Sequence, residues 1–95
     1  MNNWFNNIKE CVKTNLNGIY GDVLVSGDSS DEIIFCPHKK QNIKIHLYHI
    51  NDKDADLFIE NNGKIDCKRV VHSFSTNKEI KESLMKMIEM ENDSL

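Results

Sequence analysis

Three cysteines and four histidines are the side chains of this 95-residue sequence best suited to metal binding or nucleophilic catalysis. Zinc sites in small proteins use these residues at short spacings such as C-x-x-C and H-x-x-x-H. Neither spacing occurs here. The members available for a scattered site are Cys36, His38, His46, His49, Cys67 and His72. We therefore expect reduced, buried thiols and surface imidazoles, and we predict no metal and no cofactor.

Two further segments match functional motifs over part of their length. The range 52–63 begins like a calcium loop, with Asp at its first, third and fifth positions. Such a loop needs Gly at its sixth position and a bidentate Glu at its twelfth, where this chain has Leu57 and Gly63. Cys36 and His38 could pair as nucleophile and base, but no third group is placed to orient them. We predict that the chain is not an enzyme.

Length and composition indicate one globular domain spanning residues 1–95. The chain is 39% hydrophobic and 28% charged, as in folded rather than disordered proteins. Its net charge is −3, and Arg69 is the only arginine. Arginine is the usual residue for bidentate contacts to phosphate and guanine, so its scarcity counts against a nucleic-acid partner.

The sequence also predicts where the protein acts and suggests its origin. No apolar run approaches the ~20 residues that span a bilayer, and the first residues lack the basic and apolar segments of a signal peptide. An odd number of cysteines favours a reducing compartment. We therefore expect a cytoplasmic protein without membrane contact. Abundant Asn, Ile and Lys, which have A/T-rich codons, suggest an A/T-rich bacterial, phage or parasite genome.

Helical spacing marks both ends of the chain. Near the N-terminus an apolar stripe is formed by Trp4, Phe5, Ile8, Val12 and Leu16. Asn2 or Asn3 can cap the start of this helix, and Gly18 is placed to end it in a left-handed turn.

The C-terminal helix has a capping box at its start, since Thr76 and Glu79 can each satisfy a backbone amide of the other. Its apolar face then consists of Ile80, Leu84, Met87 and Ile88, widened by Met85 and Met90.

Between the helices, five runs of β-like residues are separated by turn residues. They are Ile19–Ser26, Glu32–Cys36, Ile43–Ile50, Ala55–Glu60 and Lys64–Phe74. Connections this short require antiparallel neighbours, because a parallel crossover needs a dozen or more residues. We predict a two-layer α+β fold, a five-stranded antiparallel meander flanked by an N-terminal and a C-terminal helix.

The last two strands allow a prediction of register. A three-residue loop at 61–63 places Glu60 opposite Lys64, whereas a two-residue loop would mix apolar and charged side chains on both faces. In the chosen register the core face holds Leu57, Ile59, Ile65 and Cys67. The other face holds the opposite-charge pairs Glu60–Lys64 and Asp56–Lys68.

The same reasoning pairs the third strand with the fourth. Leu47 then lies opposite Ile59, Ile43 and Ile45 join the core face, and Tyr48 lies opposite Phe58 on the other face. An aromatic pair ringed by charge is typical of protein contacts. The predicted partner-binding residues are Tyr48, Phe58, His46, Lys44, Glu60 and Lys68.

These observations favour a non-enzymatic protein-binding domain, such as a small inhibitor, immunity or adaptor protein. Its partner is expected to be another protein or a second copy of the chain. Two alternatives stay open: a nucleic-acid-binding small β-domain, and a metal-binding protein that uses the Cys and His set.

Overall fold

The computed structural model describes residues 4–29 and 31–93, which form two helices and five strands. Their order is α1 (Trp4–Tyr20), β1 (Val23–Asp28), β2 (Glu32–Pro37), β3 (Ile43–His49), β4 (Asp54–Asn61), β5 (Lys64–His72) and α2 (Asn77–Asp93). The strands make one antiparallel sheet in chain order, β1-β2-β3-β4-β5. The predicted α+β class and element order are confirmed.

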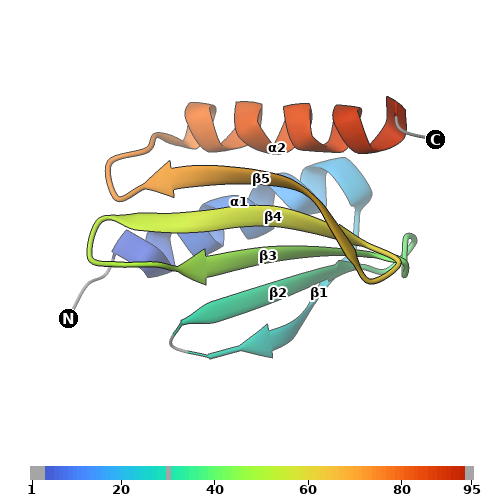
Figure 1. Ribbon diagram of the computed structural model, residues 1–95, viewed down its shortest axis with the longest axis horizontal. Coiled ribbons are helices and arrows are strands. Elements are labelled where there is room, and N and C mark those ends of the chain that lie inside the picture. Colours follow the sequence, from blue (N-terminus) through green and yellow to red (C-terminus); the bar gives the residue numbers. More distant parts are fainter. Residues whose placement is uncertain (1–3, 30, 94–95) are drawn as a thin grey trace.

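Both helices contribute to a single core against one face of the sheet. Figure 1 shows α1 behind the sheet and α2 running alongside β5. The buried helix residues are Phe5, Ile8, Val12 and Leu16 of α1 and Ile80, Leu84, Met87 and Ile88 of α2. They pack on every second strand residue, among them Phe35, Leu47 and Leu57. Neither described helix covers the other side of the sheet, which we call the open face.

Helix α1 ends later than the sequence predicted. The helix continues through Gly18 to Tyr20, and Gly21 takes the left-handed conformation at φ +83°. The Gly21 amide donates to the Asn17 carbonyl at 2.9 Å, which closes the last turn. Ile19 and Tyr20 pack partly buried against the core as part of the helix, so the predicted strand 19–26 starts only at Val23.

The capping box of α2 is confirmed. The Thr76 amide donates to Glu79 Oε1 at 2.9 Å, and the Glu79 amide donates to the Thr76 hydroxyl at 3.2 Å. These hydrogen bonds lower the pKa of the Glu79 carboxyl, the backbone bond from Thr76 being the main cause. Met85 and Met90 are exposed, so the predicted widening of the buried stripe is wrong. The caps predicted for α1, at positions 2 and 3, lie outside the described residues.

The β4–β5 turn contains two residues, not the predicted three. Asn62 and Gly63 both have positive φ, +53° and +84°, as the Asn-Gly type I′ hairpin requires. Glu60 therefore lies opposite Ile65 instead of Lys64.

A β-bulge in β5 then restores the alternation that a two-residue turn would otherwise lose. Asp66 is the extra residue, since Ile59 pairs with Cys67 on its far side. Leu57 and Ile59 are fully buried, as predicted, and Cys67 packs partly buried against the core. Ile65 is exposed, and its predicted place in the core is wrong.

Candidate functional site

The open face is formed by the even-numbered residues of β2, β3 and β4 and by their neighbours on β1 and β5. The odd-numbered residues of these three strands, such as Ile33, Ile45 and Ile59, are buried under the helices. All six predicted partner-binding side chains lie on the open face: Lys44, His46, Tyr48, Phe58, Glu60 and Lys68. Their role in binding stays a prediction.

The pairing of the two predicted aromatic residues is wrong. Tyr48 lies opposite Asp56, and Phe58 lies opposite His46. The rings of His46 and Phe58 are stacked, with centroids 4.7 Å apart and planes 7° apart. The core pairing shifts likewise, because Leu47 faces Leu57 and not Ile59.

This shift of two residues originates in the β3–β4 loop. The Asn51 side-chain oxygen accepts hydrogen bonds from the amides of Lys53 and Asp54, at 2.8 and 2.9 Å. This Asx turn shortens the loop, and the Ile50 amide donates to the Asp54 carbonyl at 3.1 Å. A shift of two residues preserves the faces, so each side chain remains on the predicted side.

A network of charged side chains surrounds the stacked rings. His46 is only 9% exposed, and its Nε2 donates to Glu60 Oε1 at 3.1 Å. Its Nδ1 lies 3.5 Å from Glu32 Oε2. Asp56 contacts Lys68 Nζ at 2.9 Å, so that predicted pair forms, although diagonally across the strands. The centre of the open face is thus held by contacts across four strands.

Apolar side chains surround this centre on the open face. Four large ones are between 44% and 60% exposed: Leu24, Tyr48, Ile65 and Val70. The prediction included only Tyr48. The bulge at Asp66 explains why Ile65 was predicted on the core face, because it interrupts the alternation by which a sequence reveals its faces.

A second stacked pair lies where β5 ends. His72 Nδ1 donates to the Asp54 carboxylate at 2.5 Å, and this hydrogen bond is the main cause of the lowered pKa of Asp54. The His72 ring stacks on Phe74 with centroids 5.0 Å apart. Phe74 is 76% exposed. Sequence reasoning missed this group because its members belong to two strands and a turn.

Both edges of the sheet are unsuited to pairing with another strand. Edge strand β1 carries a register shift between Val25 and Gly27, and edge strand β5 carries the bulge at Asp66. A Cβ on Gly27 would lie 3.1 Å from Ile34 Cδ1, so the absence of a side chain at Gly27 lets β1 approach the open-face side chain of Ile34. Bulges on edge strands hinder edge-to-edge association.

The thiols do not converge on a reactive centre. Cys11 donates to the Asn77 side-chain oxygen at 2.6 Å, and burial raises the pKa of its thiol. Cys36 lies beside Ser26 on the open face, whereas Cys67 packs on the core side. Within residues 4–29 and 31–93, no group of three or more His, Cys, Asp or Glu side chains is arranged to hold a metal ion.

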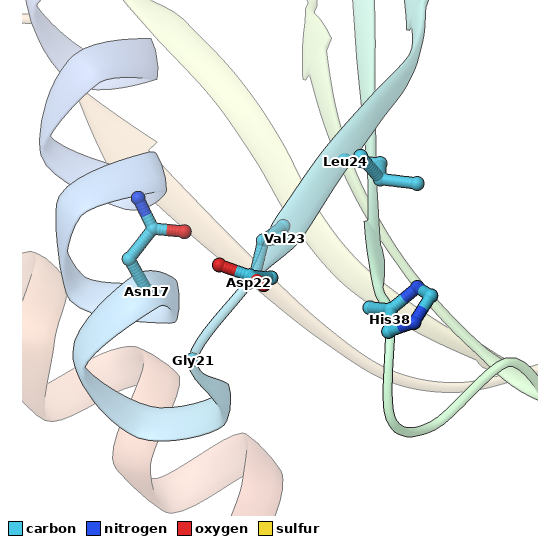
Figure 2. Close-up of a pocket in the computed structure, with 6 residues that line it drawn as sticks. All are labelled: Asn17, Gly21, Asp22, Val23, Leu24 and His38. Atoms are coloured by element: carbon cyan, nitrogen blue, oxygen red, sulfur yellow. The ribbon is translucent and has the colours of Figure 1, made fainter.

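A pocket of about 570 Å³ lies where α1 meets β1 and the β2–β3 turn. Figure 2 shows its lining residues: Asn17, Gly21, Asp22, Val23, Leu24 and His38. The His38 amide donates to the Asp22 carbonyl at 3.0 Å, which joins two of its walls. The side chains of Asn17, Asp22 and His38 are exposed, so the pocket provides no buried charge to fix a ligand.

No family model matches this chain, and neither the curated proteins nor the solved structures include a significant match. In the part of the chain that the structure describes, neither helix is both long and apolar enough to cross a membrane.

Proposed function

We propose that this chain is a non-enzymatic protein-binding domain that acts through the open face of its sheet. The supporting observation is the group of four exposed apolar side chains, Leu24, Tyr48, Ile65 and Val70, around the stacked His46–Phe58 pair. Exposed apolar and aromatic side chains among charged ones are characteristic of protein contacts. The bulges in β1 and β5 hinder the addition of a strand at either edge, so the open face is the favoured binding surface.

The alternatives have less support. Nucleic-acid binding needs cationic side chains toward the phosphates, whereas the open face presents the carboxylates of Glu32, Asp56 and Glu60. Catalysis by Cys11 would need a readily formed thiolate, and burial raises the pKa of that thiol.

We further propose that the protein works in the cytoplasm as a small inhibitor, immunity or adaptor protein of bacterial or phage origin. The three thiols of Cys11, Cys36 and Cys67 form no disulfide, as suits a reducing compartment. A second copy of the chain is the alternative to a different protein as the partner.

A library of natural protein fragments displayed on phage tests the binding face directly. Fragments selected on the wild-type domain should bind the Tyr48→Ala, Phe58→Ala double variant at least about thirty-fold more weakly, as expected when central interface residues are truncated. Met85→Ala, an exposed change on α2, should leave binding unchanged. Circular dichroism melts establish that each variant is folded.

The opposite pattern would contradict the proposal. Fragments that depend on Met85 and ignore Tyr48 and Phe58 would assign binding to the helix side. A double variant that fails to fold would place its rings among the residues that hold the fold together, and the single Tyr48→Ala variant then tests the face.

A further inference from the structure

We infer that the partner places an arginine or lysine side chain over the ring of Tyr48, between the carboxylates of Glu32 and Asp56. This inference rests on the proposed function, because it names the chemistry of the partner at the same face. It goes further in assigning a charge to that partner and a location to its anchoring residue.

The register of three strands builds this arrangement. Tyr48 on β3 lies directly opposite Glu32 on β2 and directly opposite Asp56 on β4. Side chains in such positions have Cβ atoms about 4.5–5.5 Å apart, so an acidic residue lies on each side of Tyr48. Tyr48 is 44% exposed and thus accessible. An aromatic face attracts ammonium and guanidinium groups, and flanking carboxylates add ion pairing.

The charge around Tyr48 favours a cationic partner. The loops and strands at the same end of the sheet carry Asp31, Glu32, Asp52, Asp54 and Asp56, in addition to Asp28 at the end of β1. The basic residues at this end are Lys53, Lys68 and Arg69, of which Lys68 already contacts Asp56. His46 faces Glu32 and His72 bonds Asp54, so each contributes further positive charge only when protonated. The end of the sheet is therefore net negative with neutral histidines.

A second copy of the chain is a poorer occupant of this end. If two copies met with this end against itself, Glu32 and Asp56 would face the same carboxylates on the other copy, and like charges repel. A shared strand edge is disfavoured by the bulges in β1 and β5. A partner with arginine or lysine beside apolar side chains complements both the net negative charge of this end and the exposed Val70 opposite Asp56.

Fluorescence anisotropy with two labelled peptides tests the inference. One peptide is amphipathic and composed of Leu and Arg, and the other has Glu in place of every Arg. We expect the Arg peptide to bind at least tenfold more tightly. Glu32→Gln should weaken its binding about tenfold, whereas Glu10→Gln, the same charge change at an exposed site on α1, should weaken it less than twofold.

Conservative variants separate ring recognition from general electrostatic attraction. Tyr48→Phe keeps an aromatic face and should bind the Arg peptide like the wild type, whereas Tyr48→Leu should bind about tenfold more weakly. Equal effects of Glu32→Gln and Glu10→Gln, or of Tyr48→Phe and Tyr48→Leu, would overturn the inference. A concentration-dependent dimer in sedimentation that Tyr48→Leu abolishes would also overturn it, in favour of a second copy.

Failure of this inference is distinguishable from failure of the proposed function. If displayed fragments require Tyr48 and Phe58 while the Arg peptide ignores Glu32 and Tyr48, the inference fails and the binding face stands. If the fragments ignore the open face as well, both fail.

Discussion

Single side chains on and around the open face are fixed by partners from distant positions in the chain, as the Asp54–His72 pair illustrates. The hydrogen bond from His72 lowers the pKa of the Asp54 carboxyl. A carboxyl whose pKa is lower in the folded than in the unfolded state stabilises the fold above its ordinary pKa. That contribution is lost as the pH falls through the lower, folded pKa. The pair therefore stabilises the start of β4 against the end of β5 at neutral pH.

This account predicts the titration of Asp54 in a His72→Gln variant. Carbon-detected NMR of the carboxyl groups should show the Asp54 pKa rising toward its ordinary value, because the main cause of its depression is removed. The pKa of Glu79 should stay low, since its main cause is the bond from Thr76. If the Asp54 pKa is the same in the wild type and the variant, the hydrogen bond from His72 is not the cause of its depression.

At the scale of elements, the β4–β5 hairpin offers a matched pair of substitutions. Ile59 is fully buried against the helices, whereas Ile65 lies exposed on the open face. Ile59→Ala should destabilise the protein by about 2–5 kcal/mol through lost burial and a cavity. Ile65→Ala should change the free energy of unfolding by less than about 0.5 kcal/mol. Urea denaturation measures both, and similar losses from the two variants would indicate that Ile65 shares the core.

The end of α1 offers a second pair. Gly18 lies within the helix with open space where a Cβ would be, so Gly18→Ala should stabilise by up to about 1 kcal/mol. Gly21 has φ +83°, and Gly21→Ala should cost about 1–2 kcal/mol. Thermal melts of the two variants should therefore shift in opposite directions. Shifts in the same direction would contradict the helix end at Tyr20.

Local sequence patterns predicted the elements but not their registers. The apolar spacing from Phe5 to Leu16 and the Thr76–Glu79 capping box depend on neighbours within a few residues, and both are as expected. Strand register depends on how a turn closes. The Asx turn of Asn51 and the bulge at Asp66 each moved a pairing without leaving a periodic signal in the sequence.

The candidate site was predicted in part for the same reason. The face of Tyr48 and Phe58 was predicted correctly, because a shift of two residues preserves alternation. The residues opposite Tyr48 and Phe58 were predicted wrongly, because each of the two has a different cross-strand partner in the structure. Phe74 lies beyond the last strand, and its contact with His72 follows from the turn, which no spacing rule describes.

The whole molecule has two layers, with helices on one face of a five-stranded sheet and none of the described helices on the other (Figure 1). Charge is distributed unevenly along the strands. Carboxylates gather near the β1–β2 and β3–β4 loops, whereas Lys39, Lys40 and Lys44 lie toward the β2–β3 turn. This polarity should orient a partner that docks on the open face, and added salt should slow its association.

Methyl NMR mapping of the wild-type domain with a selected protein fragment tests the central claim most directly. If the open face binds, the methyl resonances of Ile34, Ile65 and Val70 should shift or broaden, while those of the exposed helix residues Met85 and Met90 stay unchanged. Shifts confined to Met85 and Met90, with Ile34, Ile65 and Val70 unaffected, would contradict the claim and assign binding to the helix layer.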